Sequence, residues 1–258
     1  MPYQFIRVET QDRITTITIN RPEVMNALHP PANEELGKAF DAFAADDNAW
    51  VCIITGAGEK AFSAGNDLKV TASGQKFNMN WSGGFGGITN RHDLFKPVIA
   101  AVNGVALGGG FEIALASDII IAAEHATLGL PEPRVGLVAG AGGMHRLPRM
   151  IPQKIAMGMM LRAKPLQARQ AEKLGLVNEV VPLADLMDTA RRWAREILEC
   201  APLSVRLTKQ AAKLNLHLSV QDALNTQTPL HKTFLDSEDR KEGPKAFAEK
   251  RKPNWKGR

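Results

Sequence analysis

The segment 96–112, KPVIAAVNGVALGGGFE, constrains the fold of this chain more than any other stretch. Its small apolar run at 98–102 follows a proline and predicts a buried strand. An Asn-Gly turn signal comes next, and the glycine triplet 108–110 then opens the helical pattern FEIALAS. Glycines at a helix start leave backbone N–H groups free and let a ligand approach the main chain. The segment therefore predicts an anion site, with Glu112 in the first helical turn.

Apolar patterns on either side of this segment predict an α/β fold. Alternating residues at 5–9 and 14–20 predict a hairpin, and apolar runs at 51–55, 118–122 and 177–181 predict further strands. Because strand patterns alternate with helical ones, this part of the chain on its own fits a doubly wound sheet.

Two regions carry the clearest helical periodicity. An apolar stripe at 33–45 predicts one helix, and the region 183–249 is helical throughout. We therefore predict an α/β core at 1–182, which holds the active site, and a helical C-terminal region at 183–258. The stripe consists of Leu36, Ala39, Phe40 and Phe43, and the predicted breaks in the C-terminal helices are Pro202, Pro229 and Gly243-Pro244.

Composition narrows the class of protein. No apolar run reaches the ~20 residues that a membrane-spanning helix needs, and the N-terminus lacks the pattern of a secretion signal. Because Cys52 and Cys200 are the only cysteines, we expect a reduced, cytoplasmic protein without a disulfide framework. The net charge of +5 suits an anionic substrate. The basic end, 250–258, is either a solvated tail or a docking segment for a phosphate-bearing ligand or a neighbouring subunit.

Two further stretches fit an active site. The segment 61–68, AFSAGNDL, follows a predicted strand, and the carboxyl ends of strands are where open α/β sheets bind ligands. The segment 71–88 is rich in glycine and polar residues and has no periodicity. Since regular patterns resume on both sides of it, we expect a mobile active-site loop rather than a linker.

Taken in order, these stretches resemble the crotonase superfamily, the enoyl-CoA hydratases and isomerases. The similarity covers essentially the whole chain, and several motifs carry it. They are NRPEVMNAL, ITGAGEKAFSAGNDL, KPVIAAVNGVALGGGFEIALASD, LPEPRVGLVAGAGGMHRLPR, AEKLGLVNEVV and EGPKAFAEKRKPNWKGR.

The resemblance implies a fold, an assembly and a reaction. It replaces the doubly wound sheet by a spiral of ββα turns, with the C-terminal helices driving assembly into a trimer or a hexamer. It implies addition of water to an enoyl-CoA, with Glu112 and Glu132 as the acid–base pair. It implies an oxyanion hole formed by the N–H groups of Ala64 and Gly109, and no metal or cofactor beyond the coenzyme A of the substrate. The implied substrate-binding residues are Ala64, Gly65, Asn66, Asp67, Leu68, Trp81, Phe85 and Gly108.

Other interpretations stay open for single residues. Taken alone, Glu112 fits a carboxylate stabilised by the helix dipole, Glu132 a surface loop residue, and Trp81 an anchor of its loop. His29 and His145 are expected to be structural, whereas His92 is a candidate for the acyl pocket.

Two other activities occur among similar sequences. An isomerase of the same superfamily often keeps one of the two glutamates, so the presence of both favours water chemistry. A crotonase that binds RNA uses a lysine-rich first helix. Here that helix has one lysine, Lys38, and several acidic residues, which repel phosphate, so we expect no nucleic-acid partner. Hydrolytic branches carry an aspartate where this chain has 138–141, VAGA, which lowers the hydrolase interpretation.

Overall fold

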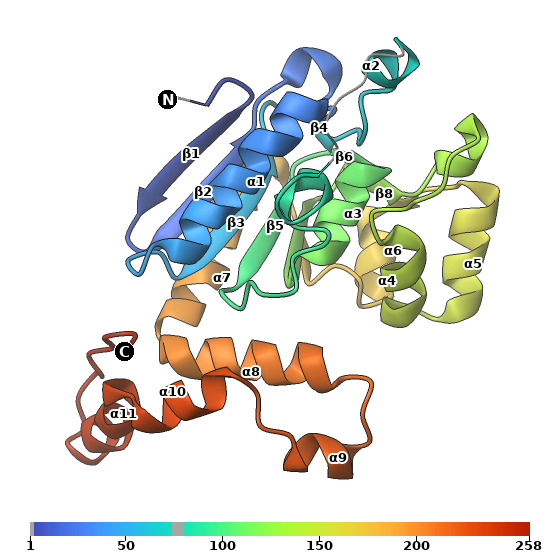
Figure 1. The fold of residues 1–258 in the computed structure, drawn as a ribbon. Coiled ribbons are helices and arrows are strands. Elements are labelled where there is room, and N and C mark those ends of the chain that lie inside the picture. The colour runs from blue at the N-terminus through green and yellow to red at the C-terminus, as the bar shows by residue number, and fades with distance from the viewer. Residues whose placement is uncertain (1–2, 74–79) are drawn as a thin grey trace.

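The structure is a computed structural model that describes residues 3–73 and 80–258 (Figure 1). A six-stranded sheet runs in the order β1-β2-β3-β5-β7-β10, and a four-stranded sheet in the order β4-β6-β8-β9. The strands are β1 Ile6–Gln11, β2 Ile14–Ile19, β3 Val51–Gly56, β4 Ala61–Ser63, β5 Val98–Val102, β6 Val105–Leu107, β7 Ile119–Ala123, β8 Thr127–Gly129, β9 Leu166–Gln167 and β10 Glu179–Val181.

The connections between the two sheets confirm the predicted spiral. Strands β3, β5 and β7 pair in parallel in the first sheet, and the strand that follows each of them, β4, β6 or β8, enters the second sheet. After β4 and β6 a helical segment leads back to the first sheet, whereas after β8 the chain first adds β9 to the second sheet and then returns to β10. Each turn of the chain therefore contributes two strands and a helix, which a doubly wound single sheet does not do. Strands β3 and β5 are buried along their whole length, as expected for parallel strands covered on both faces.

Helices cover the sheets and continue beyond them. Within the sheet-containing part they are α1 Pro30–Ala45, α2 Leu68–Ala72, α3 Gly109–Ala116, α4 Gly143–Met150, α5 Gln153–Arg162 and α6 Ala168–Lys173, with the 3-10 turns η1 Pro22–Val24, η2 Phe85–Gly87 and η3 Glu132–Val135. After β10 come η4 Leu183–Asp185, α7 Leu186–Leu198, α8 Pro202–Asn215, α9 Val220–Asn225, α10 Leu230–Asp236 and α11 Glu238–Ala248.

Several boundaries differ from the sequence-based expectation. Helix α1 begins at Pro30 rather than at 33, because a proline in the first turn has no N–H that needs a partner. The predicted break at Gly243-Pro244 is wrong, since both residues lie inside α11. A Cβ on Gly243 would lie 3.2 Å from the Trp255 ring, so glycine lets the C-terminal tail pack closely on this helix.

The C-terminal helices divide into a part that packs on the sheet and a part that extends from it. Helix α7 packs on β3, β5 and β7, whereas α8 to α11 lie apart from the sheets (Figure 1). Lys209 ties α8 to the core through Asp118 Oδ2 at 2.6 Å and the Lys96 carbonyl at 2.7 Å. Helix α7 lies after residue 182 in the sequence but packs on the sheet. The predicted division of the chain at 182/183 therefore stays a prediction.

The basic C-terminal tail folds back on its own chain. The N–H groups of Lys256 and Gly257 donate to Asp239, and Trp255 Nε1 donates to the Glu199 carbonyl at 2.8 Å. These contacts favour neither of the two interpretations of the tail, because its partner is the protein itself. Among the residues that the structure describes, none of the helices combines the length and the apolar character needed to cross a membrane.

Candidate active site

At the start of α3, the main chain lies very close to the main chain of neighbouring strands. Gly108 caps the helix with φ of 55°, and its N–H donates to the Gly129 carbonyl at 2.9 Å. A Cβ on Gly110 would lie 2.1 Å from the Ser63 carbonyl oxygen, so only glycine lets the end of β4 approach this turn. Gly109 is the first helical residue, and its N–H therefore lies among those that the helix leaves without an internal acceptor.

The structure corrects the assignment of Ala64 to the oxyanion hole. The Ala64 N–H already donates to the Met25 carbonyl at 2.9 Å, which removes it as a donor for a substrate oxygen. Asn66 forms a parallel bridge with Leu28, in which the Leu28 N–H donates to residue 65 at 2.7 Å and residue 67 donates to the Leu28 carbonyl at 3.0 Å. In such a bridge the N–H of the central residue points away from its partner strand. The outward N–H of Asn66, rather than that of Ala64, is therefore the candidate for the second oxyanion donor.

Gly65, the residue before Asn66, lies directly against Gly109. A Cβ on Gly65, which has φ of 88°, would lie 2.8 Å from Gly109 N and 2.7 Å from the Leu107 carbonyl oxygen. The loop therefore rests directly on the start of α3, and glycine is required at 65 both by the space and by the backbone angle. Two adjacent outward N–H groups are the geometry that stabilises an oxyanion.

Of two residues predicted to bind substrate, Asp67 is used by the fold, whereas the role of Leu68 stays a prediction. The Asp67 carboxylate is 3.1 Å from Arg21 Nη1 and also accepts from the Val70 N–H as the cap of α2. Its buried ion pair holds the loop in place rather than leaving the carboxylate for a ligand. Leu68 begins α2 with 43% of its surface exposed, and nothing in its surroundings distinguishes it as a substrate contact.

The structure brings Glu112 and Glu132 together at the same turn. Glu112 is buried on α3 and accepts a hydrogen bond from the Gly143 N–H at 2.8 Å on Oε1. Glu132 begins η3, and its Oε1 would lie 3.3 Å from a Cβ on Gly108. The interpretation of Glu132 as a surface loop residue is thus wrong, because its Oε2 is buried, with no hydrogen-bond partner among the residues that the structure describes.

Both glutamates have raised pKa values, for related reasons. Burial raises the pKa of Glu112 to about 7; the Gly143 N–H opposes this shift, the nearby Glu132 adds to it, and Ala141 and Arg146 oppose it. Burial is also the main cause that raises the pKa of Glu132. A carboxyl group that titrates near neutral pH can both take and give a proton, as acid–base catalysis requires.

Phe85 forms a wall over the oxyanion site. A Cβ on Gly109 would lie 2.4 Å from the Phe85 ring, and Trp81 packs edge-on to that ring with centroids 6.3 Å apart. The turn that carries Phe85 is fixed, because the Gly86 N–H donates to the buried Asn33 Oδ1 at 2.7 Å. Of the predicted mobile loop 71–88, residues 74–79 lie outside the described part of the chain, whereas η2 is packed against α1.

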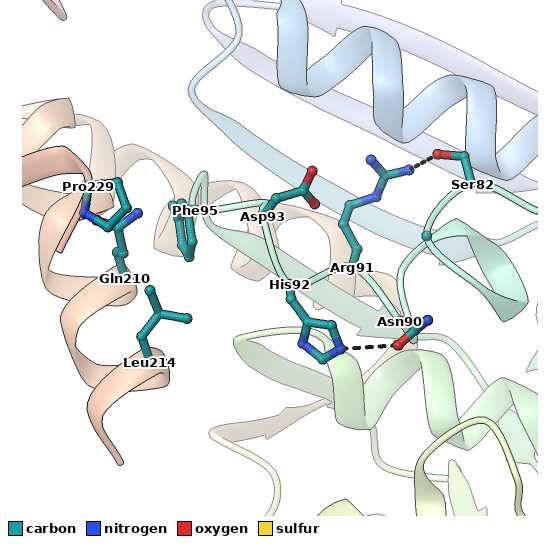
Figure 2. A pocket seen from close by; sticks show the side chains of 10 residues that line it. Ser82, Asn90, Arg91, His92, Asp93, Phe95, Gln210, Leu214 and Pro229 are labelled. Atoms are coloured by element: carbon teal, nitrogen blue, oxygen red, sulfur yellow. Dashed lines mark hydrogen bonds between the residues drawn. The ribbon is translucent and has the colours of Figure 1, made fainter. Parts of the chain in front are cut away.

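The predicted role of His92 is not supported. His92 is exposed, hydrogen-bonds Asn90 at 3.1 Å and lines a cavity of about 530 Å³ between the 82–95 segment and α8 (Figure 2). Neither glutamate lines this cavity, so it is separate from the acid–base pair. His29 packs edge-on to Phe5 at 4.3 Å, which fits its expected structural role, whereas His145 is exposed.

The sequence analysis missed the support that loop 141–143 gives to Glu112. The only signal was a glycine cluster before a helix pattern, GAGGMHRLPR, the same arrangement as at the start of α3. Gly143 begins α4, and Arg146 on its first turn reaches back to the Ala141 carbonyl of the loop. No cluster of three or more His, Cys, Asp or Glu side chains suited to a metal ion occurs within 3–73 and 80–258.

Comparisons with known proteins identify the family. Residues 9–258 match the family model described as enoyl-CoA hydratase/isomerase. The chain is 44% identical to a carnitinyl-CoA dehydratase of Salmonella arizonae over 98% of both chains, and 41% identical to one of Proteus mirabilis over 99% of both. A crystal structure of an enoyl-CoA hydratase from Mycobacterium tuberculosis superimposes with a TM-score of 0.92 at 41% identity, covering 98% of this chain and 99% of that one.

Proposed function

The chain belongs to the enoyl-CoA hydratase/isomerase family, and we propose that it is a hydro-lyase in which Glu112 and Glu132 move the protons. The observation that carries this proposal is the convergence at one helix start. The buried Glu112, the half-buried Glu132 and two outward backbone N–H groups, those of Asn66 and Gly109, lie around the glycine turn. A carbonyl held by the two donors would have both carboxylates beside it.

The reaction follows from the surroundings of each group. The thioester oxygen accepts from Asn66 and Gly109, which draws electrons from the C2–C3 double bond. Glu112, whose anion receives backbone hydrogen bonds, takes a proton from water as the oxygen adds to C3. Glu132 then protonates C2 of the enolate, and dehydration is the reverse. We expect no cofactor beyond the coenzyme A of the substrate.

The oxyanion assignment is tested at Asn66. Asn66→Pro deletes the N–H and should lower kcat by about 100-fold or more, the usual cost of one oxyanion donor. Asn66→Ala keeps the N–H and removes only the side-chain bond from Nδ2 to Thr71 at 2.8 Å, so it should stay within about threefold of wild type. Equal, mild effects in steady-state hydration of crotonyl-CoA would show that another donor holds the oxygen.

For the acyl group we propose crotonobetainyl-CoA, with plain crotonyl-CoA as the rival. The Trp81–Phe85 pair beside Gly109 supports the choice, because a trimethylammonium group gains about 0.5–2 kcal/mol from each aromatic face. The similarity to carnitinyl-CoA dehydratases supports it too. Two departures from those proteins oppose it: Asn66 stands where they have tryptophan, and the loop at 139–141 lacks their aspartate.

The two substrates are separated by kcat/KM in wild type and in Trp81→Ala. The proposal predicts a preference for crotonobetainyl-CoA that the variant loses selectively, by about 3- to 30-fold for one lost cation–π contact. Turnover of crotonyl-CoA in the same variant serves as the internal control. A wild-type preference for crotonyl-CoA, with no selective loss in the variant, contradicts the carnitine interpretation and leaves the hydratase intact.

We also propose assembly into a trimer or a hexamer through the helices that extend from the sheets. Leu216, Val220, Leu224 and Phe247 are between 77% and 86% exposed, which is unusual for so many large apolar side chains in one region. Leu216→Asp combined with Leu224→Asp should lower the mass seen in sedimentation velocity to that of a monomer. An unchanged trimer mass would contradict this choice of surface.

A further inference from the structure

Arg146 is a half-buried cation held by neutral groups. Its Nη2 donates to the Thr89 carbonyl at 2.7 Å and its Nη1 to the Ala141 carbonyl at 3.2 Å. Among the residues that the structure describes, Glu112 is the one charged group recorded as acting on it. Burying a guanidinium without a contacting carboxylate is costly, so this position calls for a reason beyond packing.

The two carbonyls belong to the two loops that shape the reaction site. Thr89 follows the turn that carries Phe85, the wall over Gly109. Ala141 lies in the loop whose Gly143 N–H donates to Glu112, and the Ala141 N–H stabilises the same carboxylate. The Ala141 residue thus serves Glu112 with its N–H and Arg146 with its carbonyl.

The chain makes room for this guanidinium. A Cβ on Gly142 would lie 1.9 Å from Arg146 Nη1, and Gly142 has φ of 108°, which side chains rarely adopt. Glycine at 142 therefore allows the loop to fold over the guanidinium while Gly143 faces Glu112. We therefore expect the backbone conformation of residues 141–143 to depend on the Arg146 side chain.

We propose that Arg146 is a positioning residue for Glu112, which fixes the 141–143 loop against the Thr89 loop and places a positive charge beside the carboxylate. The inference rests on the proposed function, since it concerns the group that takes the proton from water. It extends that function by assigning the position and the ionisation of Glu112 to a side chain that does not touch the reacting atoms.

The electrostatic part of the role has a definite sign. Two charged groups face Glu112, namely Glu132 from η3 and Arg146 from α4. Burial and Glu132 raise the pKa of Glu112, whereas the backbone donors and Arg146 lower it. Removal of the guanidinium charge must therefore raise the pKa of Glu112 further, which leaves less of the anionic base at neutral pH.

The test compares Arg146→Gln, Arg146→Lys and the control Arg149→Gln by kcat/KM for crotonyl-CoA from pH 5 to 9. Arg149 lies on the same helix but is exposed. Arg146→Gln should move the midpoint of the rising limb upward by about half a unit to one unit, so the loss at pH 6 exceeds that at pH 9 by about 3- to 10-fold. Arg146→Lys keeps the charge but not the planar fork, so it should lower kcat about fivefold or more with the midpoint in place.

The outcomes separate this role from a merely structural one. An unmoved midpoint in Arg146→Gln, or wild-type kcat in Arg146→Lys, overturns the proposal; if Arg146→Gln fails to fold, the kcat of Arg146→Lys decides. The Glu112 carboxyl is also titrated directly, by infrared difference spectra against Glu112→Gln, which needs no turnover. If the wild type does not hydrate crotonyl-CoA, the proposed hydratase activity is contradicted. If the pKa of Glu112 from the infrared titration is nevertheless higher in Arg146→Gln than in wild type, the positioning role is supported.

Discussion

The two regions that supply the glutamates both raise the pKa of the carboxyl group by burial, but they surround that group with different neighbours. On the α3 side, Glu112 faces a loop whose backbone N–H groups, from Ala141 and Gly143, stabilise its anion, and Arg146 adds a positive charge. On the η3 side, Glu132 has a buried Oε2 without a partner in the described part of the chain. Donors to a carboxylate favour its charged form and burial favours the neutral acid, so the two groups differ in how far donors and charges offset their burial.

On the proposed function, this difference in surroundings assigns the role of base to Glu112 and that of acid to Glu132. The ββα spiral ends three successive turns near the same point, after β4, β6 and β8, so a donor loop, a helix start and a glutamate turn all face one space. Glu112 then meets the start of α4, whereas Glu132 lies against the glycine cap of α3. The asymmetry leads to predictions that decrease in expected size.

The largest effect is expected from removing either acid–base group. Glu112→Gln and Glu132→Gln should each lower kcat for hydration by at least ~100-fold, the lower end of what positioned acid–base groups contribute. Both variants should still bind a CoA ester, because the Asn66 and Gly109 donors are unchanged. Steady-state kinetics with a competitive acyl-CoA inhibitor measure both quantities. Near-full activity in either variant contradicts the two-glutamate mechanism.

Isotope exchange tests whether the two roles differ. If Glu132 serves C2, a saturated acyl-CoA incubated in ²H₂O should exchange its C2 proton with wild type and with Glu112→Gln, but about 100-fold more slowly with Glu132→Gln. Mass spectrometry of the recovered thioester gives the rate. Faster exchange by Glu132→Gln than by Glu112→Gln would reverse the assignment of the two regions.

A smaller effect is expected from pH. Since hydration needs Glu112 as an anion, and burial raises its pKa to about 7, kcat/KM should rise with pH through about 7 and fall about tenfold for each unit below it. Glu112→Gln should flatten this limb in its residual activity. A rising limb near pH 4.5 in the wild type would show that the carboxylate is solvated during turnover.

The sequence could predict the positions of the glutamates but not the donors around them. The motifs around Gly109 and Glu132 located the reaction site, and the stripe of α1 and the buried β5 matched simple periodicity. The bridge between Asn66 and Leu28 decides which N–H group of the SAGN stretch points outward. Because this contact joins residues far apart in the sequence, the motif alone predicts Ala64, which is wrong. The packing of Arg146 under its loop depends on tertiary contacts for the same reason.

The smallest expected effect concerns stability, and it arises from the same burial. The folded-state pKa of Glu112 is about 7 against an ordinary 4.5, so ionising it costs the folded protein about 3 kcal/mol at pH 8. Below pH 4.5 the group is protonated in both states and costs nothing; stability is then lost as pH rises to about 7. Glu112→Gln should therefore raise Tm relative to wild type by several degrees at pH 8 and much less at pH 5, whereas the exposed control Glu34→Gln should change neither. If Glu112→Gln is no more stable than wild type at pH 8, the backbone donors and Arg146 fully offset the cost of burying the Glu112 anion. The two glutamate regions would then differ less than their contacts suggest.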